Sequence, residues 1–224
     1  MNVLPATGPA ELRVENVGLD FAGNRALNAV TIAFSAGIPV AVTGPSGSGK
    51  SALCFVLAGA VAPTQGSVLF DGLPISPVTR QEIGLILQVH GLVGGLTAIE
   101  NVALPLQARH MRPHEVRDAS GRALALVGLA DDGERLVDEL SGGERQRVGI
   151  ARALAGDPRI VIADEPTAEL DPDNREIVLS LLLERASQQR IVIVASDDPG
   201  VVARFPRVVE LEAGHVRAIG PSQV

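Results

Sequence analysis

The sequence predicts an α/β fold with a mainly parallel sheet, and two observations lead to this prediction. Short apolar runs of the kind that form buried strands recur along the chain, at residues 38–43, 67–70, 83–87, 160–163, 191–195 and 208–211. Helical patterns separate several of them. In residues 173–189 one stripe contains Ile177, Val178, Leu181 and Leu182, with charged residues opposite. Such alternation of strands and helices is typical of parallel sheets that helices cover.

Two segments depart from this alternation. Residues 12–34 favour antiparallel hairpins, as in "ELRVENVGLDF" and "NAVTIAF", and residues 92–155 are mostly helical in pattern. The helical segment predicts an insertion between two halves of the sheet. We therefore expect one domain over residues 1–224, with a core of about 1–91 and 156–224 and a helical subdomain of about 92–155.

Composition restricts the classes of function. The 224 residues can bury a sizeable core, and a content of 46% hydrophobic and 20% charged residues is ordinary for a globular chain. The formal net charge of -7 argues against wholesale nucleic-acid binding, so no nucleic-acid partner is expected. Cys54 is the single cysteine, which excludes an internal disulfide framework and a cysteine metal cluster.

The localisation that the sequence predicts is cytoplasmic. The N-terminal stretch "MNVLPATGPAELRV" lacks the basic and apolar regions of a secretory signal. Residues 51–70 carry no charge, but "PTQG" interrupts them and leaves an apolar stretch shorter than the roughly 20 residues of a membrane span. A lone cysteine also fits a reducing compartment.

The segment "GPSGSGKS" at residues 44–51 has the pattern G-x-x-x-x-G-K-[ST]. It follows the strand-like "IPVAVT" and precedes the helix-like "ALCFVLAGA", which is the context that a phosphate-binding loop requires. Its backbone N–H groups and the helix N-terminus attract phosphate. Lys50 is expected to neutralise β- and γ-phosphate charge, and Ser51 to ligate Mg²⁺. The expected nucleotide-binding residues here are Gly44, Pro45, Ser46, Gly47, Ser48, Gly49, Lys50 and Ser51. The simpler alternative is a Gly/Ser-rich turn that caps a helix.

A second acidic motif, "RIVIADEP" at residues 159–166, is an apolar strand that ends in Asp164 and Glu165. The carboxyl ends of strands are where α/β sheets bind ligands. Asp164 is expected in the Mg²⁺ shell, and Glu165 is expected to polarise the attacking water. An acidic strand end alone is usually a solvated turn. Together with residues 44–51 it favours nucleotide hydrolysis.

The segment "LSGGERQRV" at residues 140–148 indicates the family. Ser141 and Glu144 fit a capping box, but a capping box does not require Gly142 and Gly143, which are costly in a first helical turn. Glycines there let backbone approach a phosphate at a helix N-terminus. With the two preceding motifs, the chain resembles the nucleotide-binding subunit of ABC-type ATPases over about residues 12–217.

The resemblance implies an α/β P-loop NTPase (RecA-like) core with an N-terminal antiparallel β subdomain and an inserted helical subdomain. It also implies that two chains sandwich two ATP·Mg²⁺ head to tail, so that Ser141, Gly142 and Gly143 bind the ATP of the partner subunit. The segment "LTAIENVALPL" at residues 96–106 is similar to the branch that includes lipoprotein-release, macrolide-efflux and cell-division ATPases.

Three further positions match the family. Gln88, after "IGLIL", matches the Q-loop glutamine that senses Mg²⁺ and the transmembrane partner, although a lone Gln is otherwise a surface polar residue. "AELD" at residues 168–171 matches the D-loop, although Asp171 and Pro172 also form a good N-cap and N1 pair. Phe21 lies where the family stacks an aromatic ring on adenine, with a buried core Phe as the alternative. Stacking selects weakly among bases, which leaves GTP open.

One position departs from the family. In "RIVIVASDDP", residues 190–199, Asp197 stands where the family has a histidine, between Ser196 and Asp198. A histidine can donate a hydrogen bond to the γ-phosphate, whereas an ionised Asp only accepts and carries like charge. Two unit charges about 4 Å apart at an effective dielectric near 20 repel by roughly 4 kcal/mol. The departure predicts a slow nucleotide site, although Glu165 is intact.

The sequence thus predicts an ATPase subunit that binds and hydrolyses ATP and powers an ABC transporter through a separate transmembrane permease. It would lie on the inner face of the cell membrane and pair with a second ATPase subunit, identical or different. The alternatives are a regulatory, weakly hydrolysing ATP-binding partner in a heterodimeric complex, and a soluble ABC-type ATPase without a role in transport. The cargo and its direction stay open.

Overall fold

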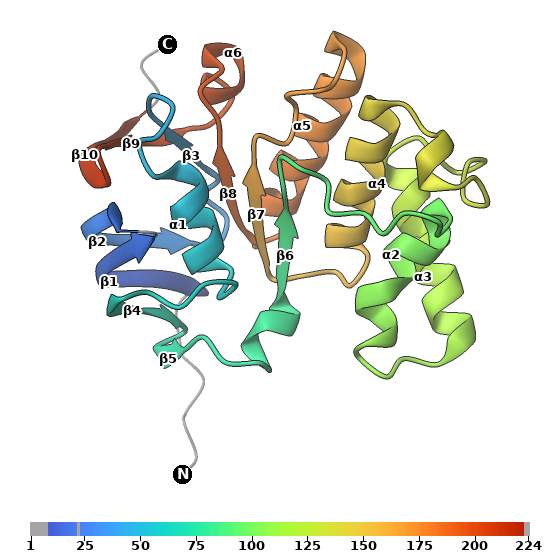
Figure 1. Ribbon diagram of the computed structural model, residues 1–224, viewed down its shortest axis with the longest axis horizontal. Coiled ribbons are helices and arrows are strands. Elements are labelled where there is room, and N and C mark those ends of the chain that lie inside the picture. The colour runs from blue at the N-terminus through green and yellow to red at the C-terminus, as the bar shows by residue number, and fades with distance from the viewer. Residues whose placement is uncertain (1–8, 22, 222–224) are drawn as a thin grey trace. The chain divides into compact units, whose positions relative to one another are not determined.

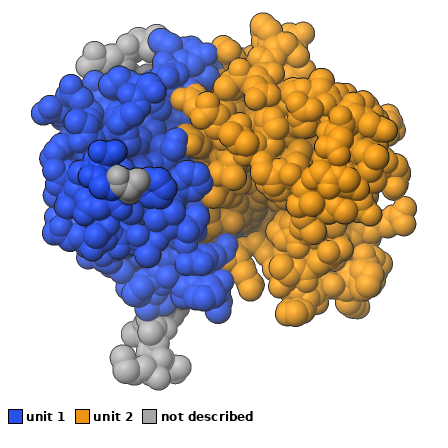
Figure 2. Space-filling model, in the orientation of Figure 1, with its two compact units in different colours: residues 1–80, 183–224 blue, residues 81–182 orange. Residues whose placement is uncertain are grey.

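The computed structural model describes residues 9–21 and 23–221. Most of the N-terminal stretch used for the localisation prediction, residues 1–8, lies outside the described residues. The chain forms two compact units, residues 1–80 with 183–224 and residues 81–182 (Figure 2). The helical segment expected at about 92–155 falls within the second unit.

The first unit contains an antiparallel sheet in the strand order β2–β1–β4–β5. β1 (Glu11–Phe21) pairs with β2 (Asn24–Ser35) along its length, and β4 (Gln65–Phe70) lies on its other side, followed by β5 (Leu73–Pro74). Alternate residues of β1, such as Leu12 and Val14, are buried. The hairpin predicted for residues 12–34 is confirmed.

The same unit contains a second set of strands in the order β10–β9–β3–β8 (Figure 1). They are β3 (Val40–Thr43), β8 (Ile191–Ala195), β9 (Arg207–Glu212) and β10 (His215–Pro221). β3 runs parallel to β8 and β9, and every residue of β8 is buried, which explains its uninterrupted apolar sequence. Helix α1 (Lys50–Leu57) follows β3, and the short α6 (Pro199–Val202) follows β8. The loop after β3 and the turn after β8 therefore share one edge.

The second unit combines two parallel strands with packed helices. β6 (Ile83–Ile86) pairs with β7 (Ile160–Asp164), and α4 (Gly142–Leu154) packs against β6. α2 (Ala98–Gln107) and α3 (Pro113–Leu126) pack on each other and on α4 (Figure 1). The remaining helices are the 3₁₀ turns η1 (Thr79–Glu82) and η2 (Val137–Glu139), and α5 (Pro172–Ser187).

Two details differ from the sequence prediction. Ile177 was expected on the buried stripe of α5 but is 45% exposed, whereas Leu179 is buried with Val178 and Leu182. The buried face is therefore centred one position further along, which leaves Ile177 at its margin. Strand β10 was not predicted, because only about half of its residues are apolar and most are exposed.

None of the helices in the described part of the chain combines the length and the apolar character that a membrane crossing requires.

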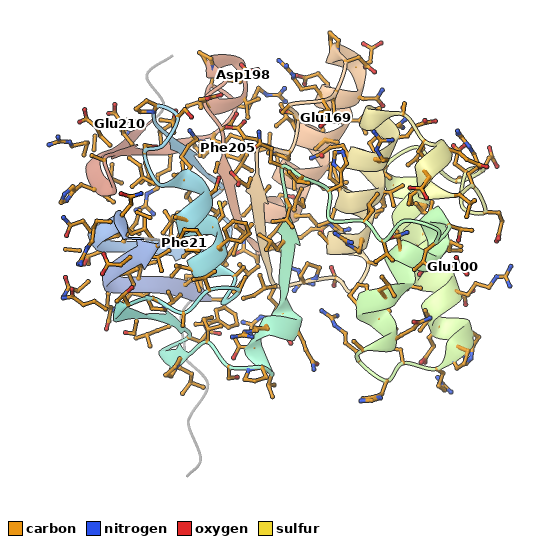
Figure 3. All side chains as sticks on the ribbon, in the orientation of Figure 1. Phe21, Glu100, Glu169, Asp198, Phe205 and Glu210 are labelled. Carbon is orange, nitrogen blue, oxygen red and sulfur yellow. The ribbon has the colours of Figure 1, made fainter. Side chains whose placement is uncertain are left out.

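Asn101 connects the start of α2 to the loop before it. Its side chain is fully buried, and its Oδ1 accepts a hydrogen bond from the Val93 N–H at 2.7 Å. Its Nδ2 donates to the Val93 and Thr97 carbonyl oxygens at 3.2 and 3.0 Å. Thr97 forms a capping box at the same helix end with Glu100, which Figure 3 labels. The amide thus joins both backbone groups of Val93 to the first turn of α2.

We expect Asn101→Ala to lower the free energy of unfolding by about 1–3 kcal/mol, because it removes the partner of the Val93 N–H and of the Val93 carbonyl, whereas the Thr97 carbonyl keeps the backbone N–H of residue 101. Urea denaturation measures this directly. The exposed Gln107→Ala at the other end of α2 serves as the control and should leave stability within about 0.5 kcal/mol. Equal stability of both variants would show that Asn101 does not hold this loop.

Candidate functional site

The glycine-rich loop, residues 44–51, connects β3 to α1 and depends on glycine at two places. Gly44 and Gly49 have φ values of 147° and 107°, which side chains disfavour. A Cβ at Gly44 would lie 2.1 Å from the Leu211 carbonyl oxygen, and one at Gly49 would lie 2.6 Å from that of Ala26. Backbone from β2 and β9 therefore approaches the loop as closely as only glycine permits.

Backbone hydrogen bonds hold the loop in this position. The Gly214 N–H donates to the Ser48 carbonyl at 2.9 Å, and the Asn28 N–H donates to the Gly214 carbonyl at 2.9 Å. Ala213 and Gly214 form the tight turn between β9 and β10, with φ values of 46° and 78°. Sequence reasoning missed Gly214, although "EAGH" after an apolar strand is a signal for such a turn.

The loop presents features that suit an anion. The Lys50 Nζ lies over the loop and donates to the Gly44 carbonyl at 2.7 Å and the Pro45 carbonyl at 3.4 Å. The Ser48 Oγ is buried and has no hydrogen-bond partner within residues 9–21 and 23–221. A positive ammonium group and a helix N-terminus at one glycine-rich turn form a site where phosphate binds favourably. The simpler alternative of a plain capping turn does not explain the buried Lys50.

The turn after β8 lies at the same edge of the first unit. The Ser196 Oγ accepts from the Asp198 N–H at 3.2 Å, and the Asp198 Oδ1 accepts from the Gly200 N–H at 2.7 Å at the start of α6. Asp198, labelled in Figure 3, therefore caps α6. Asp197 is exposed beside it. The α6 cap accounts for the presence of Asp198 and Pro199, but it does not account for an aspartate at position 197.

Phe21 is the last residue of β1, and its side chain is 67% exposed (Figure 3). This exposure excludes the alternative that Phe21 is a buried core residue. An exposed ring has a face on which a base can stack.

In the second unit, the ends of two parallel strands bring Gln88, Asp164 and Glu165 to one edge. Ile86 of β6 pairs with Ala163 of β7, so the exposed Gln88 and the Asp164–Glu165 pair follow neighbouring strands. Asp164 is 4% exposed. Glu165 has a φ of 47°, a backbone conformation that is uncommon outside glycine and is often found at functional sites.

The N-terminus of α4 contains the predicted capping box. The Glu144 N–H donates to the Ser141 Oγ at 3.3 Å, and the Ser141 N–H donates to the Glu144 Oε2 at 2.7 Å. The pKa of Glu144 is lowered to about 2, mainly by the hydrogen bond from the Ser141 backbone. The Ser141 side chain and Arg135 lower this pKa further. Arg135 donates to the Glu144 Oε1 at 3.0 Å.

The Glu169 residue lies against the two glycines that follow Ser141. A Cβ at Gly142 would lie 2.6 Å from the Glu169 Oε2, and one at Gly143 would lie 3.3 Å from the Glu169 carbonyl oxygen. The sequence analysis gave no role to Glu169. The signal that could have drawn attention to this residue was its place within "AELD", the segment that matches the D-loop. The same segment caps α5, because the Asn174 N–H donates to the Asp171 Oδ1 at 2.9 Å.

The family model described as ABC transporter matches residues 27–168, which include the glycine-rich loop, the end of β7 and the N-terminus of α4. The chain belongs to the ABC transporter family. The family predicted from the three motifs is therefore confirmed.

Two curated relatives come from Mycobacterium tuberculosis, from strains ATCC 25618 / H37Rv and CDC 1551 / Oshkosh. Each is an uncharacterized ABC transporter ATP-binding protein, Rv0073 and MT0079, 37% identical over 213 residues. The match covers 90% of this ABC chain and 64% of each relative, so the chain spans less than two thirds of their length.

Solved structures confirm the predicted P-loop NTPase fold with an antiparallel β subdomain and a helical insertion. The dimeric bacterial ABC transporter cassette MJ0796 is 31% identical, with a TM-score of 0.88 over 95% of this chain and 99% of its own. MJ0796 in a post-hydrolysis state bound to ADP and Pi is 30% identical, with a TM-score of 0.87 over the same shares. CbiO1 of Clostridium perfringens, part of the transporter complex cbiONQ, is 28% identical, with a TM-score of 0.83 over 96% and 90%.

The capping box of this ABC chain predicts a pH-dependent stability. The folded-state pKa of Glu144, about 2, lies below the unfolded value of about 4.3. The stabilisation is therefore present above the unfolded pKa and is lost as pH falls towards 2. We expect Glu144→Gln to lower the free energy of unfolding by about 1 kcal/mol at pH 7, and the difference to shrink at pH 3.

Urea denaturation of both proteins at pH 7, 5 and 3 measures this difference. The control is Asp118→Asn, since it removes an exposed carboxylate in the middle of α3, away from the helix caps. A Glu144→Gln effect that is the same at pH 3 as at pH 7 would contradict the assignment.

Proposed function

We propose that this chain is the ATP-binding and ATP-hydrolysing subunit of an ABC transporter and powers a separate transmembrane permease. The observation that carries the proposal is the glycine-rich loop with Lys50 over it, in a chain of the ABC transporter family. The neighbour that was solved with ADP and Pi supports ATP hydrolysis as the reaction. The whole chain, residues 1–224, is then one ABC ATPase domain.

The triphosphate is held mainly by the loop. The backbone N–H groups of residues 44–51 and the N-terminus of α1 bind the phosphate oxygens, and Lys50 moves from the loop carbonyls to the β- and γ-phosphates. The exposed ring of Phe21 stacks on the base. Because stacking and phosphate contacts select weakly among bases, GTP is a competing substrate.

Ser51, Gln88 and Asp164 are the residues that would hold Mg²⁺, as the resemblance to the family implies. The described residues contain no group of three or more His, Cys, Asp or Glu side chains that suits a metal on its own. Mg²⁺ commonly binds through one or two carboxylates together with substrate phosphates, so a ligand set with Asp164 as its one carboxylate is chemically suited to this ion. Bound there, Mg²⁺ neutralises charge on the β- and γ-phosphates.

Glu165 then positions and polarises the attacking water. Its carboxylate accepts a hydrogen bond from the water, and its φ of 47° at the end of β7 sets the direction of the side chain. Catalysis in this class rests mostly on positioning and on stabilisation of charge.

A second ATPase subunit completes each site. Ser141, Gly142 and Gly143 at the N-terminus of α4 bind the ATP of the partner subunit, and the dimeric form of MJ0796 supports such pairing. CbiO1 is part of a multi-subunit transporter complex, which supports a permease partner here. The protein then lies on the cytoplasmic face of the cell membrane through that permease. Its charge of -7 makes nucleic acid an unsuitable partner.

A regulatory role with weak hydrolysis is the second candidate, and the exposed Asp197 favours it. At the edge shared with the glycine-rich loop, a carboxylate replaces a hydrogen-bond donor and repels the γ-phosphate. The chain's own site is then slow, while its Ser141–Gly143 segment still completes the site of a different, faster subunit.

We expect Asp197→His to raise ATP turnover on the order of tenfold, which corresponds to relief of about 1.4 kcal/mol of the barrier. The measurement is steady-state phosphate release with the transmembrane partner present. Glu165→Gln is the matched control in both backgrounds and should abolish most of the turnover, because it removes the group that polarises water. Turnover that stays unchanged or falls in Asp197→His would show that Asp197 does not slow the site.

A further inference from the structure

Glu169 places a carboxylate against the N-terminus of α4. Its Oε2 lies 2.6 Å from the position that a Cβ of Gly142 would occupy, and its backbone carbonyl lies next to Gly143. Figure 3 labels this side chain in the segment between β7 and α5. The carboxylate therefore lies beside the positive end of the α4 dipole, which also attracts phosphate.

His90 holds Glu169 in this place. The His90 Nε2 lies 3.4 Å from the Glu169 Oε2. The His90 Nδ1 is buried and lacks a hydrogen-bond partner among the described residues. The imidazole ring therefore lies beside the Glu169 carboxylate.

The two arginines near the helix start have partners other than Glu169. Arg135 donates to both Asp132 and Glu144, and Arg145 donates to the Leu140 carbonyl oxygen at 2.6 Å. Within the part of the chain that the structure describes, Glu169 forms no ion pair with a Lys or Arg. The Glu169 side chain is 50% exposed, which leaves it accessible to a bound molecule at this helix end.

We propose that the Glu169 carboxylate weakens binding of the partner subunit's triphosphate to the Ser141–Gly143 segment. This inference rests on the proposed function, in which that segment binds the partner's ATP. The carboxylate repels the phosphates and competes with them for the α4 N-terminus, so a higher ATP concentration is needed to close the two-subunit site. Glu169 belongs to neither the glycine-rich loop nor the residues proposed to bind this chain's own nucleotide, so its expected effect is confined to closure.

The test uses the full chain carrying Glu165→Gln, in which slow hydrolysis lets an ATP-bound dimer persist. Analytical ultracentrifugation gives the ATP concentration for half-maximal dimerisation, and a fluorescent ATP analogue measures binding to the monomer. Glu169→Gln removes the charge and keeps the length of the side chain beside His90, whereas Glu169→Ala removes both the charge and the length. Asp118→Asn removes an exposed carboxylate from α3 of the same unit as the control.

We expect both Glu169 variants to lower the half-maximal ATP concentration by about three- to tenfold, with monomer binding unchanged and no shift in the control. Because the effect is electrostatic at a half-exposed group, the difference should shrink between 0.05 and 0.5 M salt, an interval over which screening increases strongly. A loss of packing alone would not make the dimer form more readily.

An ATP requirement that is unchanged or higher in Glu169→Gln, in a chain that binds ATP and dimerises, would overturn this inference and leave the proposed function standing. A shift of the same size in Asp118→Asn would also overturn it, because the effect would then be one of net charge. A chain that fails to bind the ATP analogue as a monomer would contradict the proposed function, and with it the inference.

Discussion

The site depends on one constraint, the close approach of backbone from β2 and from the β9–β10 turn to the glycine-rich loop. The Gly214 N–H bonds the Ser48 carbonyl, and no Cβ fits at Gly44 or Gly49. These contacts set the direction of the loop at the start of α1, where Lys50 reaches over it. A hairpin about 165 residues further along the chain is thus part of the same site, which explains why the first unit joins both ends of the chain.

Charge is the second property that shapes the molecule's function. Lys50 is the cation of the loop, while carboxylates follow the strands that end near nucleotide in the proposed account. Each has a different effect there. Asp198 caps α6. In the proposed account, Asp164 and Glu165 would serve the metal and the water, whereas Asp197 and Glu169 would oppose the triphosphate. Under that proposal, the rate and the closure of the ATPase would depend strongly on its partner subunit.

The sequence predicted the parts that local patterns encode. The apolar runs located β3, β7 and β8, and the spacing of glycines with Lys50 located the loop, since both signals lie within a few residues. It missed Gly214 and the His90–Glu169 pair because these contacts join residues distant in the chain. It left Phe21 undecided between core and surface, because exposure depends on which strands surround it. The stripe of α5 was misplaced by one position for the same reason.

The most direct test of the central claim, that residues 44–51 bind a triphosphate, is isothermal titration of ATP into the wild-type chain and into Lys50→Met. The account predicts measurable ATP binding in the wild type and a loss of at least about tenfold in the variant, because the ammonium group faces several phosphate oxygens. Unfolding curves that coincide would show that both proteins are folded. Equal ATP affinity in the two proteins, or no ATP binding in the wild type, would contradict the account.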